Sequence, residues 1–186
     1  MMDNYIRVYK NAISDEKCQH LIKMFESDTE NHYIQDCGQG ATLTQINFLH
    51  SSDTIWKDEV NNLSNIIGNY THQYKKDCDI KDNQWPEKFG FEPPKIKRYT
   101  PGGKDRFPEH VDVIDYKTAK RFLVAFIYLD NNEKGQTVIS PKDDTFVSFC
   151  IRGSLLLFPS LWPWLHTGMP PIDKPKYIVG SYLHYL

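Results

Sequence analysis

Apolar residues recur with a helical period in the first half of the chain. The segment ISDEKCQHLIKMFES places four of them at positions i, i+3, i+4 and i+7, from Cys18 to Phe25. This spacing puts them on one face of a helix. Ser14 is a suitable N-cap, and the two acidic residues that follow it favour the positive end of a helix. The pattern therefore predicts an amphipathic helix that covers a core.

A second helical pattern runs through SSDTIWKDEVNNLSNIIGNYTHQYKKDC, with Ser52 or Asp53 as its N-cap. Its apolar stripe consists of Trp56, Val60, Leu63, Ile67, Tyr70 and Tyr74. Gly68 weakens this helix only locally. Residues 1–92 are thus predicted to be a helical support.

From about Pro93 the period changes to that of strands separated by turn signals. The strand-like runs are KIKRYT, EHVDVI, RFLVAFIYLD, QTVIS, TFVSFCI, SLLLFP and KYIVGSYLHYL. The nearly continuous apolar run FLVAFIYL is typical of a strand buried on both faces, as in a sandwich or barrel wall. Residues 93–186 are predicted to form a β core, and no linker or repeat divides residues 1–186 into two domains.

Composition narrows the classes of function. The formal net charge is -2 and the basic residues form no stripe, so nucleic acid is not the expected partner. No apolar run approaches the roughly 18 residues of a membrane span. The four cysteines show no CxxC spacing and the N-terminus lacks the apolar segment of a signal peptide, which favours a cytoplasmic location.

Candidate chemistry begins with HVD, in which His110 and Asp112 are two residues apart. In an extended segment both side chains project to one face. The tripeptide alone is weak evidence, because a solvated surface pair has the same sequence. His166 lies in a late β region, where an antiparallel partner strand would bring it beside His110. Two imidazoles and one carboxylate then form a facial triad, the arrangement of non-haem Fe(II) sites, whereas a closed zinc site needs a fourth ligand.

Lys176 opens the last strand-like run, where a lysine is seldom buried without a partner. The carboxylate of a dicarboxylic co-substrate would neutralise it; a strand-edge lysine that protects against aggregation is the other interpretation. Tyr99, Arg121 and Thr137 stand where polar groups would border the same pocket, although each is singly compatible with an ordinary strand or turn.

The order of these motifs resembles the iron(II)- and 2-oxoglutarate-dependent dioxygenases, most closely the prolyl 4-hydroxylase branch, over residues 99–185. The resemblance is carried by RYTPGG, HVD, RFLVAFIYL, GQT, GSLLLFP, HTG, Lys176 and YLH, in that order. It implies an α+β protein, mainly β: a double-stranded β-helix (jelly roll, cupin-like) with N-terminal helices packed on one sheet. It also implies Fe(II), 2-oxoglutarate and O2, with ascorbate as a reductant and succinate and CO2 as products.

The resemblance further implies site residues. Iron would be held by His110, Asp112 and His166, and 2-oxoglutarate by Lys176, Tyr99 and Thr137, with Tyr128 as a second candidate. The residues facing the substrate would be Arg121, Tyr182, His184 and Trp164. Gln136 replaces the usual glutamate of the Gly-Glu-Thr turn, and Tyr182 stands where a tryptophan is common.

The expected substrate is a prolyl residue of a peptide or protein. Hydroxylation of another amino acid or a small molecule on the same scaffold remains open, as does a cupin-like metal-binding module without turnover. Nucleobase-repair relatives usually place arginines after the distal histidine, so KPKYIVG argues against them.

Overall fold

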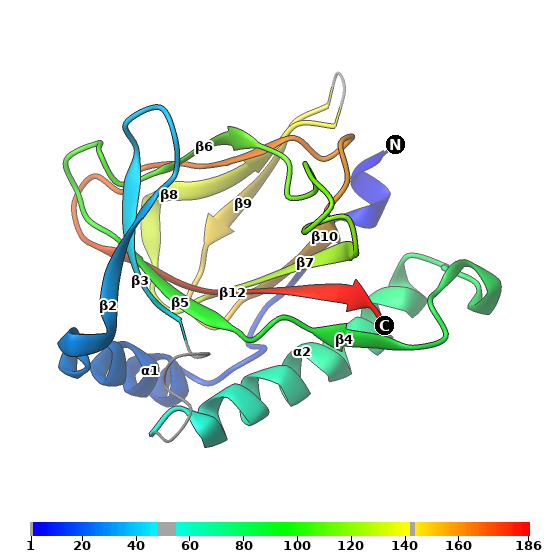
Figure 1. Cartoon of the computed structure of the whole chain (residues 1–186), viewed down its shortest axis with the longest axis horizontal. Helices are drawn as coiled ribbons and strands as arrows, with labels where there is room; N and C mark the ends of the chain where they lie inside the picture. The colour runs from blue at the N-terminus through cyan, green and yellow to red at the C-terminus, as the bar shows by residue number, and fades with distance from the viewer. Residues whose placement is uncertain (1, 48–54, 142–143) are drawn as a thin grey trace.

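Two α-helices lie against one face of a large β-sheet in the computed structural model, which describes residues 2–47, 55–141 and 144–186 (Figure 1). They are α1 (Asp15–Ser27) and α2 (Lys57–Asp77). The Ser14 side chain accepts a hydrogen bond from the backbone N–H of Lys17, as expected of an N-cap. Helix α2 begins after Trp56; the predicted caps Ser52 and Asp53 lie outside the described residues.

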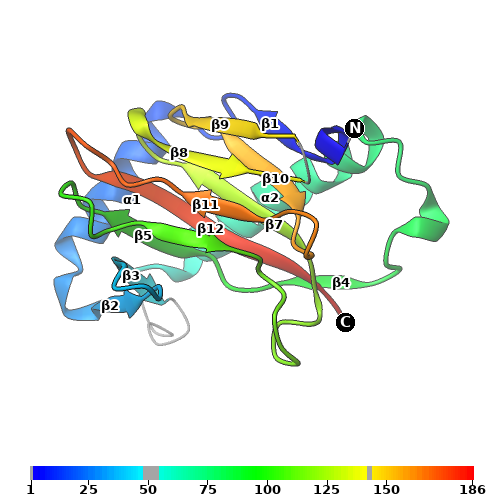
Figure 2. The same ribbon diagram turned by 90° about the horizontal axis from the view of Figure 1, so that it is seen from above.

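The strands form two sheets. The larger has the order β1-β10-β7-β12-β5-β3-β2, with β4 paired to β12, and the smaller has the order β6-β11-β8-β9. Their bounds are β1 Arg7–Tyr9, β2 His32–Asp36, β3 Thr42–Asn47, β4 Phe89–Phe91, β5 Lys95–Tyr99, β6 Phe107–His110, β7 Arg121–Tyr128, β8 Asn132–Ile139, β9 Phe146–Cys150, β10 Leu155–Pro159, β11 His166–Gly168 and β12 Lys176–Tyr185. Short 3-10 helices span Met2–Tyr5, Thr29–Asn31 and Asp82–Gln84. Seen from above, the smaller sheet overlies the larger one (Figure 2). This is the predicted double-stranded β-helix.

Strand β7 explains why its sequence is apolar throughout. Leu123, Ala125 and Ile127 belong to the core between the larger sheet and the helices. Val124, Phe126 and Tyr128 alternate with them and belong to the second core, between the two sheets. Both faces of β7 are therefore buried, and polar positions would have no access to water.

The prediction of an all-helical first half was wrong in part. Strands β1, β2, β3 and β4 also come from residues 1–92 and extend the larger sheet. In β2 the side chains of Tyr33 and Ile34 are exposed, so it lacks the polar and apolar alternation by which a half-buried strand is recognised.

Neither helix in the described parts of the chain combines the length and the apolar character needed to cross a bilayer.

Candidate active site

Three potential metal ligands meet at one end of the smaller sheet. Strands β6 and β11 are antiparallel, and His166 pairs directly with His110 in their register. Asp112 follows two residues after His110, beyond the end of β6 rather than within a strand. His166 and Asp112 are buried, and His110 is partly exposed. Within the described residues, these three form the one group with metal-ligand geometry, all ligand atoms lying within 4.8 Å of one another.

The hydrogen bonds of both imidazoles direct the same ring atom inwards. Nδ1 of His110 lies 2.8 Å from the carbonyl oxygen of Pro108, and Nδ1 of His166 lies 3.0 Å from that of Trp164. A carbonyl oxygen only accepts, so each Nδ1 carries the proton and each Nε2 presents a lone pair. Backbone contacts of this kind orient histidine ligands in metal sites.

The inward-facing atoms lack a partner among the described residues. Nε2 of His166 and Oδ2 of Asp112 are both buried without a hydrogen bond, although they lie 3.4 Å apart. The other carboxylate oxygen, Oδ1, lies 3.6 Å from Nε2 of His110. Atoms bound at about 2.1 Å to one ion lie at most about 4.2 Å apart. Both distances between the carboxylate and an imidazole lie within this limit, so Asp112 could share a divalent cation with either histidine. The cation would satisfy two lone pairs that otherwise face each other.

The protonation states suit this role. Burial lowers the pKa of His166 to about 4, so its imidazole is neutral at neutral pH. Burial alone would raise the pKa of Asp112, but His110, His166 and the Tyr182 hydroxyl hold it below its ordinary value. The site thus offers one carboxylate and a neutral imidazole without the loss of protons.

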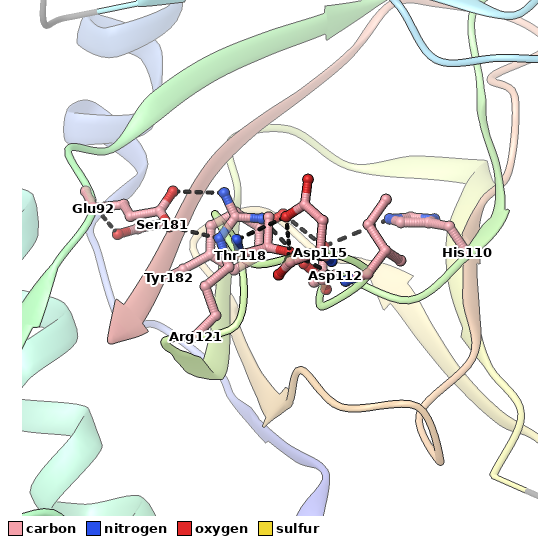
Figure 3. Close-up of polar contacts among 9 residues, drawn as sticks. Glu92, His110, Asp112, Asp115, Thr118, Arg121, Ser181 and Tyr182 are labelled. Atoms are coloured by element: carbon pink, nitrogen blue, oxygen red, sulfur yellow. Dashed lines mark hydrogen bonds and ion pairs between the residues drawn. The ribbon is translucent and has the colours of Figure 1, made fainter. Parts of the chain in front are cut away.

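Side chains from the larger sheet hold Asp112 in place (Figure 3). The Tyr182 hydroxyl donates to Oδ1 of Asp112 at 2.7 Å, and Nη1 of Arg121 donates to the Asp112 carbonyl oxygen at 3.2 Å. The Arg121 guanidinium donates to both carboxylate oxygens of Glu92, at 2.5 and 2.8 Å, and lies 3.9 Å from the centre of the Tyr182 ring. Arg121 therefore fixes its neighbours, and its charge is balanced by Glu92.

A buried cavity, here called the inner cavity, lies between the two sheets next to these ligands. It is lined by Lys97, Tyr99, Phe107, His110, Phe126, Thr137, His166, Gly168, Lys176, Ile178 and Tyr182. Lys176 is only 1% exposed, and its Nζ donates to the carbonyl oxygens of Gly135 and Met169 at 3.0 and 3.2 Å. No carboxylate among the described residues pairs with it, and burial lowers its pKa to about 8. This cavity thus presents a cation to a ligand at its closed end.

The other residues predicted to bind 2-oxoglutarate lie in or behind the same cavity. Its Nζ lies 4.3 Å from the centre of the Tyr99 ring, a cation–π distance. Thr137 lines the cavity, while Tyr128 does not: its buried hydroxyl donates to Oγ1 of Thr137 at 2.9 Å. Tyr128 thus supports Thr137 from behind.

A second, more open cavity, here called the outer cavity, adjoins the first. It shares Lys97, Phe107, His110 and Tyr182 with the inner cavity and also contains Asp112 and Arg121. Trp164 and His184 line neither cavity. The Trp164 ring packs edge-on against Tyr5, and the His184 ring lies beside Gly90. Of the four residues predicted to face the substrate, the structure thus brings Arg121 and Tyr182 to the cavities.

Several polar residues of the outer cavity were not predicted, among them a buried pair on neighbouring strands. Lys97 on β5 is 7% exposed, and Gln45, opposite it on β3, is 2% exposed. The sequence did contain a signal for Lys97. In KIKRYT, residues 95, 97 and 99 share one face of a strand, so placing Tyr99 inside also places Lys97 inside.

Comparison with known proteins identifies the fold and the family. Residues 94–184 match the model of the 2OG-Fe(II) oxygenase superfamily. No curated protein matches the chain in sequence. A viral collagen prolyl hydroxylase from Paramecium Bursaria Chlorella virus-1, solved with 2OG, is 18% identical with a TM-score of 0.65, covering 98% of this chain and 96% of that one.

Two cellular proteins share the fold. A Pseudomonas putida prolyl-4-hydroxylase is 13% identical with a TM-score of 0.68, covering 100% of this chain and 97% of the other. A Trichoplax adhaerens prolyl hydroxylase, solved with a hypoxia inducible factor peptide fragment, is 16% identical with a TM-score of 0.72, covering 97% and 84%. Residues 94–184 belong to the 2OG-Fe(II) oxygenase superfamily, and the chain is a dioxygenase that uses Fe(II), 2-oxoglutarate and O2.

Proposed function

We propose that the chain hydroxylates a prolyl residue of a peptide or protein, with Fe(II) held by His110, Asp112 and His166. The observation that carries the proposal is the pair of buried, unpartnered ligand atoms, Nε2 of His166 and Oδ2 of Asp112, beside a cavity that also contains a buried lysine. With Fe(II) and 2-oxoglutarate bound, O2 would give one oxygen atom to an unactivated C–H bond and the other to 2-oxoglutarate, which leaves as succinate and CO2.

The chain's own residues bind 2-oxoglutarate and orient the metal ligands. Lys176 pairs with the far carboxylate of 2-oxoglutarate, with Tyr99 and Thr137 beside it and Tyr128 supporting Thr137. This pairing explains why the fold tolerates a lysine that is fully buried without an anion. Tyr182 and Arg121 hold Asp112 in position for the metal.

The substrate enters through the outer cavity, which shares His110 and Tyr182 with the inner one. Two exposed apolar side chains, Ile114 and Tyr116, lie on the loop that follows Asp112, where they offer contacts to a peptide. The likeness to prolyl hydroxylases, one of them solved with a peptide, supports a peptide substrate. Roles for Trp164 and His184 in substrate binding stay predictions.

The test uses the purified chain with Fe(II), 2-oxoglutarate and ascorbate, incubated with a library of proline-containing peptides. Mass spectrometry should find peptides that gain one oxygen atom on proline, with matching release of succinate. The Asp112→Ala variant should give neither product. Succinate release with oxidation only at residues other than proline would reject the prolyl assignment and keep the dioxygenase.

A further inference from the structure

Lys97 is a second buried lysine beside the metal site. It lies on β5, on the same face as Tyr99, and is 7% exposed. Its Nζ lies 5.4 Å from the centre of the Phe107 ring and 5.9 Å from that of Phe126. Lys97 lines both the inner and the outer cavity.

No group in the described part of the chain pairs with this charge. Within the described residues, Lys97 makes neither a hydrogen bond nor an ion pair. Asp112 is the acidic group that affects Lys97 most, but it belongs to the metal site and already accepts a hydrogen bond from the Tyr182 hydroxyl. A buried ammonium without an anion costs several kcal/mol. An anionic ligand bound beside Lys97 would offset this cost.

The surroundings of Lys97 are arranged for a polar ligand. Across the strand pair, Oε1 of Gln45 is buried and has no hydrogen-bond partner in the described part of the chain. Gly180 on β12 leaves room, because a Cβ there would lie 3.7 Å from Cε of Lys97 and 3.4 Å from the Phe126 ring. An uncharged acceptor and an unpaired cation thus line the same part of the outer cavity.

The charges of the outer cavity favour an anion. Arg121 is balanced by Glu92, and Asp112 belongs to the metal site. Lys95 and Lys97 then remain as cations without acidic partners in the cavity lining. Both project from the same face of β5, because they are two residues apart in a strand.

We propose that the substrate carries a carboxylate within a few bonds or one residue of the carbon that is oxidised, and that Lys97 binds this carboxylate. The inference rests on the proposed function, in which one carboxylate of 2-oxoglutarate is at the metal and the other is at Lys176. Both ends of the co-substrate then have partners, and Lys97, on the side of the outer cavity, is left for a third carboxylate. The group comes from an acidic residue beside the proline or from the α-carboxylate of a free amino acid.

The experiment compares ligands that differ only in this charge. Anaerobic protein with Fe(II) and 2-oxoglutarate is titrated with capped peptides that carry aspartate or asparagine next to one proline, and with L-proline or L-prolinamide. Binding is followed through the visible charge-transfer band of the iron chelate. A charged hydrogen bond of about 1.5–3 kcal/mol predicts that the carboxylate member of at least one pair binds about 10- to 100-fold more tightly. The pair that shows the preference identifies the source of the carboxylate.

Variants assign the preference to Lys97. Lys97→Met should reduce it to about twofold or less, and Lys97→Arg should keep part of it. Lys174→Met, the same change at an exposed lysine outside both cavity linings, should keep all of it. The charge-transfer band of Lys97→Met, recorded without substrate, shows that the variant folds and binds Fe(II) and 2-oxoglutarate.

Three results would overturn the inference. They are equal affinity within every pair for the unchanged protein, an unchanged preference in Lys97→Met, or a loss of 2-oxoglutarate affinity in Lys97→Met as large as in Lys176→Met. Oxidised proline in a neutral peptide, without preference for a carboxylate, rejects the inference and keeps the proposed function. A preference for a carboxylate without any oxidised proline rejects the proposed prolyl substrate and keeps the inference about Lys97.

Discussion

Lys176 is fully buried, yet both of its hydrogen-bond acceptors are neutral carbonyl oxygens, those of Gly135 and Met169. Burial lowers its pKa from 10.5 to about 8. Each pKa unit corresponds to about 1.4 kcal/mol, so the charge costs the ligand-free fold at most roughly 3 kcal/mol. The residue is unfavourable for stability, which is consistent with selection for binding.

Lys176→Met is therefore expected to stabilise the ligand-free protein by about 1–3 kcal/mol at pH 7. The cost of a lysine whose pKa is lowered on folding is fully present below pH 8 and disappears as the pH rises to 10.5. The stabilisation should thus shrink between pH 7 and pH 10 in urea unfolding. Lys174→Met, at an exposed lysine that pairs with Asp130, is the control and should not stabilise. The same gain at both pH values would contradict the explanation.

Tyr182 acts on the metal through Asp112, to which its hydroxyl donates at 2.7 Å. Loss of such an outer hydrogen bond typically lowers metal affinity about 10- to 100-fold. Tyr182→Phe should therefore weaken Fe(II) binding by about tenfold in an anaerobic titration. Tyr177→Phe is the matched control, because Tyr177 lies on the same strand but its hydroxyl donates to Glu26. Equal affinities for Fe(II) in the two variants would show that the hydroxyl does not position the carboxylate.

Among the strands, the alternation of side chains between the two faces places the site residues of β12 and β5 on one face. The interior face of β12 presents Lys176, Ile178, Gly180 and Tyr182, and that of β5 presents Lys95, Lys97 and Tyr99. The opposite faces belong to the core beneath the helices, through Val179, Leu183 and Ile96. Each of these strands thus packs against the helices with one set of residues and lines the cavities with the other.

Strand β8 contributes the space that Lys176 occupies. A Cβ added to Gly135 would lie 2.7 Å from Cδ of Lys176, closer than atoms approach without a shift. Gly135→Ala should therefore displace the lysine and raise the KM for 2-oxoglutarate about tenfold or more, at an overpacking cost of about 1–3 kcal/mol. Gly68→Ala in α2, where a Cβ would make only ordinary contact, should leave that KM unchanged. An unchanged KM in Gly135→Ala would show that the lysine tolerates the methyl group.

At the scale of the whole molecule, the β core followed from the sequence because its strands are long, apolar and separated by turns. The motif order also led to His110, Asp112 and His166, which the structure brings together, and to Lys176, which lines the inner cavity with the two histidines. Strand β2 was missed because two of its side chains are exposed and it is held by pairing with β3, a long-range contact without a local signal.

Other features depended on three-dimensional contacts that no pattern encodes. The partner of Arg121 is Glu92, which comes 29 residues earlier and reaches it only because β4 pairs with β12. The absence of Trp164 and His184 from the cavity linings likewise reflects local packing against Tyr5 and Gly90. The order of the motifs therefore located the group with metal-ligand geometry and Lys176 more accurately than the residues predicted to face the substrate.

The candidate ligands come from both sheets: His110 and His166 from β6 and β11 of the smaller one, Lys176 and Tyr99 from β12 and β5 of the larger one. Metal and 2-oxoglutarate bound as proposed would link the two sheets and stabilise the whole fold. A ligand at 100 times its Kd adds about 2.7 kcal/mol, which raises the Tm of a chain of this size by about 5–10 °C.

Thermal unfolding should therefore show one increase in Tm with Mn(II), used as a redox-stable substitute for Fe(II), and a second when 2-oxoglutarate is added. Lys176→Met should keep the first increase and lose most of the second, because the metal ligands remain and the anchor for the distal carboxylate is gone. Asp112→Ala should lose both, and a chelator should reverse both in the unchanged protein. A full second increase in Lys176→Met would place the 2-oxoglutarate anchor elsewhere, and a 2-oxoglutarate effect without metal would separate the two sites.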